Sequence, residues 1–339
     1  MEIFDSKVKT MNLIFVILLL GLVVLSSLLG HYKLGFFELT DALLKKILGI
    51  PLEKNIDTVL FNVRFPRILA AIIVGGGLAM AGAVFQGVFR NPMVSPDLLG
   101  ASSSAGFGAA LGILLGLQAL QIQVLSFLFG IIGVMMSWSI AKAISKKHGD
   151  TLTLVLTGLV VSSLFQAFIS ISKMLADPMN KLPAITFWLM GGLATVSMDD
   201  TLLLIIPVLI GAVPLFFMRW RINALSFGDE EARTMGMDVN KVRLVLIVCA
   251  TLITSACVSV SGTIGWVGLI IPHLVRMMVG PDYKHVIPTS ILIGSIFLVF
   301  VDNFSRAIFP VEVPLGILTS IIGAPFFIFL LLKERRKEN

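Results

Sequence analysis

The chain alternates long apolar stretches with short polar segments over almost its whole length. A helix needs about 20 apolar residues to cross the ~30 Å hydrocarbon core of a bilayer. Lipid offers the backbone no hydrogen-bond partners, so apolar stretches of this length favour helices. Ten stretches reach or approach the length needed for a crossing, at 12–30, 64–89, 97–117, 120–145, 152–175, 200–219, 240–261, 267–281, 284–306 and 314–332. The pattern predicts an all-α polytopic membrane protein with about ten transmembrane helices in a single domain, residues 1–339.

One polar run, Arg219–Arg243, interrupts this pattern with a dense set of charges. Asp229 can cap a short helix and Gly236 can end it, while Asp238 can cap the apolar helix that follows. Charges suited to the helix dipole lie at both ends of the short helix, with Glu230 and Glu231 in its first turn and Arg233 near its end. We therefore predict one or two small helices within 221–238, lying at the membrane surface and exposed to a protein in the cytoplasm.

Two other segments do not fit a straight crossing. Residues 31–63 repeat apolar side chains at helical spacing opposite Lys45 and Lys46, which is typical of a helix in the membrane interface. Residues 177–192 contain Pro183 and paired glycines, and irregular backbone at membrane depth is tolerated where it lines a cavity. We expect a short helix there, in the mouth of a cavity.

Composition agrees with a membrane protein and indicates its orientation. Hydrophobic residues make up 57% of the 339 residues and charged residues only 14%, with a net charge of +6. Ten crossings put both termini on one side of the membrane. That side carries most of the Lys and Arg residues, so the positive-inside rule predicts that it is cytoplasmic. The positive charge is then explained by orientation. No basic patch alternates with aromatic residues as a single-strand binder requires, so we predict no nucleic-acid partner.

The sequence carries little that could do chemistry by itself. It has no G-x-x-x-x-G-K-[ST] motif, so it cannot cradle nucleotide phosphates as a P-loop does. Ser259 or Ser261 with His273 is the best candidate for a nucleophile and its base, which leaves an intramembrane serine hydrolase as a remote alternative. No chain of membrane-embedded acidic residues is visible, which argues against an ion-coupled secondary transporter but keeps that class open.

Three arginines lie on the predicted outer side, against the positive-inside trend: Arg64, Arg67 and Arg306. One interpretation is structural, since long basic side chains can reach from helix ends to the interface and Arg306 can pair with Asp302 one turn earlier. The other is a basic face on which an acidic partner docks from outside.

Six motifs in order give the chain a recognisable pattern. They are R-F-P-R-I-L-A-A at 64–71, A-G-A-V-F-Q at 81–86, R-N-P-M-V-S-P-D-L-L-G at 90–100, G-D-E-E-A-R-T-M-G at 228–236, G-T-I-G-W-V-G-L-I-I-P-H-L-V-R at 262–276 and P-V-E-V-P-L-G-I-L-T-S-I-I-G-A-P at 310–325. With these motifs the chain resembles the FecCD or cobalamin-permease-like family, the membrane permeases of type II ABC importers. The resemblance runs from the first span to Leu332 and implies ten helices per subunit.

The resemblance implies a transport subunit with no catalytic residues, no metal and no cofactor of its own. It implies a homodimer or a heterodimer with a related permease, two cytoplasmic ABC ATPase subunits that hold ATP and Mg, and an extracytoplasmic substrate-binding protein. The expected location is the cytoplasmic (inner) membrane of a prokaryote, with both termini cytoplasmic.

The resemblance also assigns residues to roles. The coupling helices that contact the ATPase match Leu225, Gly228, Asp229, Glu230, Glu231, Ala232, Arg233 and Gly236. Arg64, Arg67 and Arg306 match arginines that dock the binding protein. Thr151 matches a cytoplasmic gate, and the outer rim of the pathway matches 182–188, with Leu182, Pro183 and Trp188.

The substrate is the least determined point. A ferric siderophore is the leading expectation on the frequency of substrates in the family. Haem, a corrinoid or an oxyanion of the molybdate type stay open.

Overall fold

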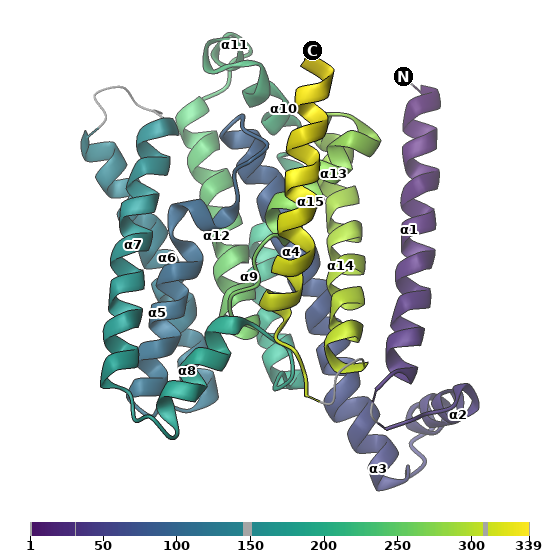
Figure 1. Ribbon diagram of the computed structural model, residues 1–339. Helices are drawn as coiled ribbons and strands as arrows, with labels where there is room; N and C mark the ends of the chain where they lie inside the picture. The colour runs from purple at the N-terminus through teal and green to yellow at the C-terminus, as the bar shows by residue number, and fades with distance from the viewer. Residues whose placement is uncertain (1, 31, 145–150, 308–310, 339) are drawn as a thin grey trace.

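The computed structural model describes residues 2–30, 32–144, 151–307 and 311–338, and every regular element in these ranges is helical. Figure 1 shows the long helices standing side by side in one bundle. In chain order the elements are α1 Glu2–Leu28, α2 Phe36–Ile47, α3 Lys54–Asp57, η1 Thr58–Arg64, α4 Phe65–Val88, η2 Pro96–Leu99, α5 Ala101–Leu114, α6 Ala119–Ile144, α7 Thr151–Leu175, α8 Lys181–Met190, α9 Met198–Phe217, α10 Arg219–Phe227, α11 Asp229–Thr234, α12 Val239–Ser261, α13 Val267–Val279, α14 Tyr283–Ala307 and α15 Leu315–Glu338. The predicted all-α fold is confirmed.

The membrane-crossing helices correspond in order to the ten predicted stretches. In the described ranges, seven helical stretches are long and apolar enough to cross a bilayer, and three shorter apolar helices lie in α5, α13 and α15. The short helix α3, the π-helical segment η1 and α4 join into one continuous stretch, Lys54–Val88. At 1.5 Å per residue, the 14-residue α5 and the 13-residue α13 reach only about 20 Å. Irregular backbone must therefore complete these two crossings.

Two helices differ in extent from the apolar stretches that predicted them. The first helix begins at Glu2 and not near residue 12, because the Asp5 carboxylate lies 2.8 Å from His285 Nε2 of α14 and holds the first turns against the bundle. The predicted span 97–117 is divided into the 3-10 turn η2 and the short α5. Gly100 separates them with φ +85°, a left-handed conformation that glycine adopts without steric cost.

The two ends of the bundle differ. Figure 1 shows both termini, α10 and α11 at one end, which we call the inner end because the sequence predicts that it faces the cytoplasm. Helices α2, α3 and α8 lie at the opposite, outer end. As predicted for residues 31–63, α2 is amphipathic, since the apolar Leu39 and Ala42 are buried while the charged Asp41 and Lys46 are exposed. Which end meets the cytoplasm stays a prediction.

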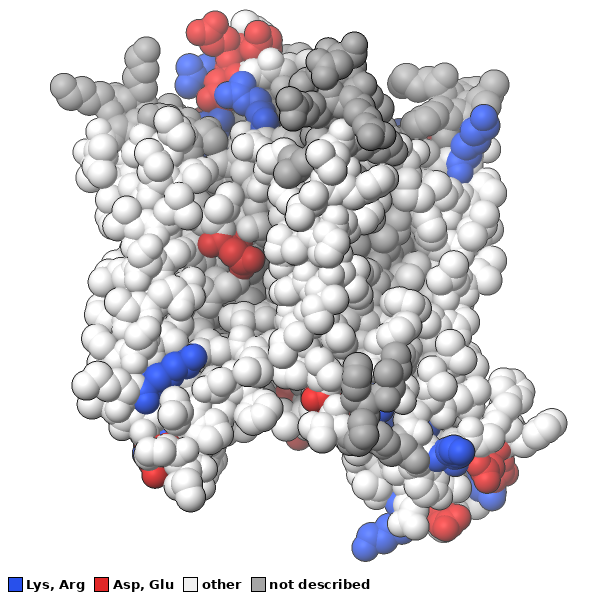
Figure 2. Space-filling model, in the orientation of Figure 1, with Lys and Arg blue, Asp and Glu red and all other residues white. Residues whose placement is uncertain are grey.

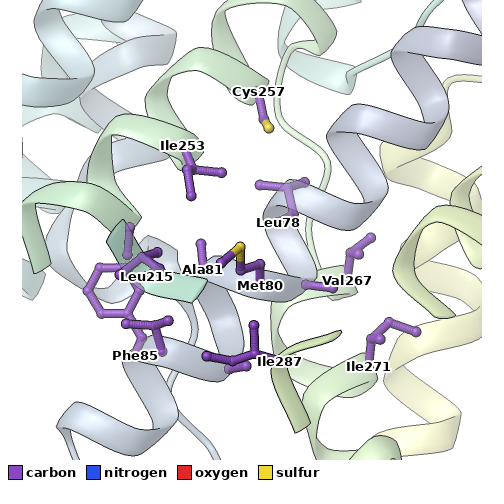
Figure 3. Packing of buried hydrophobic residues seen from close by; sticks show 14 of the residues in the cluster. Leu78, Met80, Ala81, Phe85, Leu215, Ile253, Cys257, Val267, Ile271 and Ile287 are labelled. Atoms are coloured by element: carbon purple, nitrogen blue, oxygen red, sulfur yellow. The ribbon is translucent and has the colours of Figure 1, made fainter. Parts of the chain in front are cut away.

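Helix α4 is the centre of the core. Figure 3 shows its side chains between those of α9, α12, α13 and α14, with Phe85 near Leu215 and Leu78 near Cys257. Small residues let the helices approach closely where lipid provides no hydrophobic drive for association. A Cβ added to Gly82 would overlap the carbonyl oxygen of Gly268 at the start of α13, and one added to Gly75 would overlap that of Gly294 in α14.

We expect Gly82→Ala to lower the melting temperature in detergent, because the new methyl group meets backbone of α13 that cannot rotate away. Overpacking of this kind costs about 1–3 kcal/mol. Gly21→Ala is the matched control, since a Cβ at Gly21 has no atom within 4 Å and alanine favours helices over glycine. Equal melting temperatures for the two variants would contradict the packing described for α4.

Candidate functional site

Helices α10 and α11 form a small projection at the inner end (Figure 1). Gly228, with φ +137°, joins them, and Gly236, with φ +79°, follows α11. Three apolar side chains anchor the projection by facing inward: Ile222, Leu225 and Ala232. Two large apolar side chains of the projection are exposed, Phe227 with 71% of its surface accessible and Met235 with 63%. Exposed side chains of Glu230, Glu231 and Arg233 lie between these two positions in the sequence.

Several details of this projection differ from the sequence prediction. Asp229 is the first helical residue of α11 and not its cap, because its carboxylate is held by Arg243 of α12, whose Nη2 lies 2.8 Å from Oδ1. Arg90, which follows α4, approaches the same oxygen at 3.7 Å. Leu225 and Ala232, both expected to contact a partner, are buried and support the projection from within.

The second predicted cap is confirmed. The backbone N–H of Lys241 donates to Asp238 Oδ1 at 3.1 Å, and this bond holds the pKa of the Asp238 carboxyl below its ordinary value. The cap stays ionised well below neutral pH and so keeps the start of α12 fixed next to α11.

The projection is tied to the ends of α4 and α14 as well as to α12. Asn223 Nδ2 donates to Asp282 Oδ1 at 2.6 Å, and the backbone N–H of Tyr283 donates to Asn223 Oδ1 at 2.8 Å. Ile222 and the Tyr283 ring both pack against Gly87 near the end of α4, where a larger residue would not fit. A force on α10 and α11 therefore reaches three long helices. The sequence prediction missed Asn223, Asp282 and Tyr283, whose pairing links positions about 60 residues apart.

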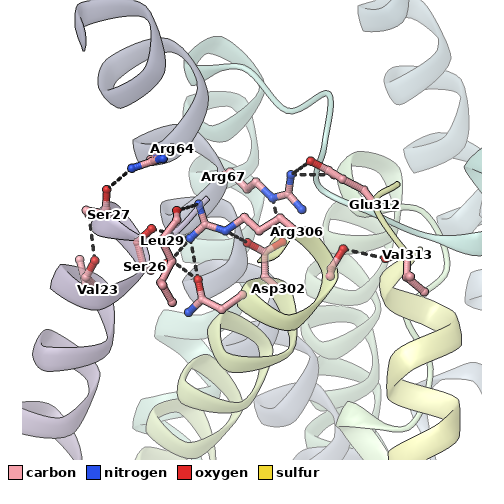
Figure 4. A network of polar contacts seen from close by, with 12 residues as sticks. Val23, Ser26, Ser27, Leu29, Arg64, Arg67, Asp302, Arg306, Glu312 and Val313 are labelled. Carbon is pink, nitrogen blue, oxygen red and sulfur yellow. Dashed lines mark hydrogen bonds and ion pairs between the residues drawn. The ribbon is translucent and has the colours of Figure 1, made fainter. Parts of the chain in front are cut away.

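The three outer arginines lie in a buried polar network, shown in Figure 4. Arg67 donates from Nε to Asp302 Oδ1 at 2.8 Å and from Nη1 to both Glu312 oxygens, at 2.9 and 2.8 Å. Arg306 lies 3.6 Å from the other Asp302 oxygen, which is the pair that the spacing predicted. Asp302 is only 1% exposed, while Glu312 is partly exposed and covers Arg67 from the surface.

The remaining arginine contacts are to α1 and α14. Arg64 Nη1 donates to the Ser27 carbonyl oxygen at 2.5 Å, and Arg306 Nη2 donates to Asn303 Oδ1 at 2.6 Å. Arg64 and Arg67 are 3% exposed and Arg306 is 5% exposed. In this conformation they join α1, α4 and α14 and do not form the exposed docking face that was predicted, because carboxylates and carbonyls of the same chain surround them. A docking role for them stays a prediction.

Two hollows lie between the network and the inner half of the bundle. The outer one, about 460 Å³, is lined by α8, the end of α12 and the segment before α15, with Arg67, Gln123, Trp188, Ser261 and Glu312 among its walls. The second, about 480 Å³, is lined by η2, α5, the end of α8, residues 263–265 and the start of α15.

A tight backbone junction separates the two hollows. The N–H of Gly192 donates to the Ser261 carbonyl and the N–H of Leu315 donates to the Gly191 carbonyl, each at 2.8 Å. Three glycines allow these backbone segments to meet: Gly191, Gly262 and Gly316. A Cβ on any of them would overlap backbone of a neighbouring segment. Irregular backbone at this depth is thus satisfied by other irregular backbone of the same chain.

Of the predicted pathway residues, Trp188 lines the outer hollow, while Leu182 and Pro183 lie nearer the start of α8 and are not part of either wall. Thr151 is the first residue of α7, and its side chain lies outside the described part of the structure. The acidic residue in the second hollow, Asp97, was missed, because the sequence placed it at the edge of a span and not at a break inside one.

The hydrolase alternative gains no support from the serine geometry. Ser259 Oγ donates to the Ala256 carbonyl at 2.9 Å and Ser261 Oγ donates to the Cys257 carbonyl at 2.8 Å. Both hydroxyls are thus bonded to the preceding turn of their own helix, as is common for serine in an apolar helix.

We expect Asp302→Asn to destabilise the protein by about 3–5 kcal/mol, because it leaves the Arg67 and Arg306 guanidiniums without the buried carboxylate between them. The measurement is thermal or denaturant unfolding in detergent. Asp41→Asn is the control, since Asp41 pairs with Lys45 on the exposed surface of α2, where such pairs contribute about 0–1 kcal/mol. A small, equal effect of both changes would show that the network does not hold the outer end together.

Comparison with known proteins agrees with this architecture. The sequence profile of the FecCD transport family matches residues 17–333. The chain is 37% identical over 322 residues to the molybdate import system permease protein MolB of Haemophilus influenzae, covering 94% of both chains, and 37% identical over 282 residues to an iron chelatin transport system permease protein of Helicobacter pylori, covering 83% and 84%. A solved structure described as an inward-facing conformation of a metal-chelate type ABC transporter superimposes with a TM-score of 0.86 at 35% identity, over 96% of this chain and 99% of that one. The chain belongs to the FecCD transport family.

Proposed function

We propose that this chain is the permease subunit of an ATP-driven ABC importer that moves a metal chelate, with ferric siderophore as the leading candidate, across the cytoplasmic membrane of a prokaryote. Family membership supports the transport class. The single observation that carries the mechanism is the exposed projection of α10 and α11, which is tied to α4, α12 and α14 in a chain without a nucleotide-binding motif.

The energy for transport comes from another chain in this proposal. The chain has no P-loop to cradle nucleotide phosphates, and in this proposal two separate ATPase subunits hold ATP and Mg. Phe227 and Met235 project like the apolar anchors that dominate protein interfaces, with the charges of Glu230, Glu231 and Arg233 beside them. We infer that this surface enters a cleft of the ATPase.

Movement would then pass along the contacts already described. A shift of α11 pulls on α12 through Asp229 and Arg243, and a shift of α10 moves the ends of α4 and α14 through Asn223 and Ile222. The ligand that drives the change binds elsewhere and biases one of two packed arrangements, as in other two-state transmission elements. A second permease subunit, the same or related, completes a pathway between the two.

At the outer end, an extracytoplasmic binding protein would deliver the cargo. The buried arginines can take part only if a carboxylate of that protein replaces Glu312 on Arg67, because Glu312 is the exposed member of the network. The substrate class is inferred from relatives whose names include both iron chelatin and molybdate. A neutral or cationic metal chelate is favoured here over an oxyanion, because the second hollow presents a carboxyl group.

We expect Phe227→Ser with Met235→Ser to abolish copurification with the partner ATPase and to lower ATP-driven uptake in reconstituted vesicles at least tenfold. Anchors of this kind contribute about 2 kcal/mol or more each to binding. Phe37→Ser, which changes an even more exposed aromatic residue on α2 at the outer end, should leave ATPase binding intact. Normal uptake by the double variant would rule out the projection as the coupling site.

Glu312→Gln tests the docking proposal. Removing this negative charge weakens the hold on Arg67, so the binding protein should bind several-fold more tightly and with a steeper salt dependence. Glu53→Gln, a change in the exposed residue just before α3, should have little effect on affinity. Unchanged or weaker docking after Glu312→Gln would remove Arg67 from the docking surface.

A further inference from the structure

Asp97 places a carboxyl group within the apolar part of the bundle. It lies in η2, between the end of α4 and the start of α5, and its neighbour Leu98 packs against Gly158, two turns into the 25-residue α7. Figure 2 shows charged side chains gathered mostly at the two ends, and acidic atoms in a hollow midway between them. Asp97 is the acidic residue among the walls of the second hollow.

A carboxylate at this depth is costly when it faces lipid, so such residues usually face water or a bundle interior and mark a pathway. Asp97 is partly exposed within the hollow. Among the described residues, the Ser102 hydroxyl alone donates to its carboxylate. A carboxylate has room for about four hydrogen bonds, so Asp97 keeps most of its capacity to accept.

Two other side chains of the hollow add hydroxyl oxygens that can accept hydrogen bonds. The Ser320 hydroxyl donates to the Gly316 carbonyl at 2.7 Å, and the Thr263 hydroxyl donates to the Leu189 carbonyl. Their protons are used within the chain, which leaves oxygen lone pairs to the hollow. Among the described residues that line it, none is Lys, Arg or His. The hollow therefore presents the Asp97 carboxyl group and side-chain acceptors, with no basic side chain among its described walls.

We propose that this hollow is a cargo station for the cationic or hydrogen-bond-donating part of the translocated molecule, such as a protonated amine, a hydroxyl group or metal-bound water. The proposal deepens the proposed function and rests on it, since it places the station on the transport path. The glycine junction of Gly191, Gly262 and Gly316 separates this station from the outer hollow. An oxyanion such as molybdate is repelled here, whereas a neutral or cationic chelate is held briefly.

The first test needs no cargo. Cys249 and Cys257 are replaced by Ala, Ser320→Cys is added, and the thiol is modified with a cationic and an anionic methanethiosulfonate reagent. After correction for their rates with a free thiol, the cationic reagent should react about tenfold faster or more, because a charged cleft concentrates opposite charge. Asp97→Asn should bring the ratio to about one, and Asp97→Glu should preserve it.

Thr195→Cys, in the outer hollow, is the matched control, and its ratio should not respond to Asp97→Asn. A Ser320→Cys thiol that reacts with neither reagent overturns the proposal, because the hollow is then closed to water. So does a charge preference that survives Asp97→Asn, since Asp97 is then not its source.

The second test measures uptake by vesicles that contain the permease, its ATPase and its binding protein. The probes are ferrioxamine B, a cationic ferric trihydroxamate, together with anionic ferric citrate and molybdate. Asp97→Asn should lower uptake of the cationic chelate about tenfold while ATP hydrolysis continues, and preference of the unaltered protein for molybdate would overturn the proposal. Absence of ATP-driven uptake of all three probes would count against the proposed function, while the thiol ratio would still decide the nature of the hollow.

Discussion

The structure depends on one constraint, that backbone polar groups at membrane depth must find partners within the protein. Helices α5 and α13 are too short to cross alone, so the chain contains irregular backbone near 89–100 and 262–266. Other irregular segments of the same chain satisfy it, as where Gly192 donates to Ser261. This arrangement requires very close approach, and glycines in α4 and at the junction make it possible. The breaks in turn create the two hollows, because a straight helix would have filled that space.

Charged side chains occur in three different environments in this chain, and the environment determines how each is stabilised. At the outer end, Arg67 and Asp302 are buried together, so their mutual attraction and hydrogen bonds offset the cost of leaving water. At the inner end, Glu230 and Arg233 are exposed on α11 and remain free to meet another protein. In the second hollow, Asp97 accepts from Ser102 alone among the described residues, and it keeps unused acceptor capacity there. The proposed recognition and pathway charges therefore differ from the structural ones in burial and in the number of their described partners.

Much of the fold could be predicted from the sequence, because the signals are local. Span length depends only on consecutive apolar residues, and the Asp238 cap needs only the residues of the next turn. The amphipathic α2 follows from the spacing of its own side chains. The residues of the candidate site were harder to predict from the sequence. Leu225 was expected to face a partner and is buried, because its direction depends on how α10 packs against α4 and not on its own neighbours in sequence.

The sequence by itself determined the all-helical class, the order of the crossings and the exposed polar projection between α9 and α12, since hydrophobic length, caps and charge are properties of short segments. Only the tertiary structure decided which charges are buried and which face a cavity. Arg67 meets Asp302 across 235 positions, and Asp97 lines a hollow because the chain breaks between Pro96 and Gly100 beside other helix ends. Such contacts depend on segments that are distant in sequence, and no local pattern records where those segments meet.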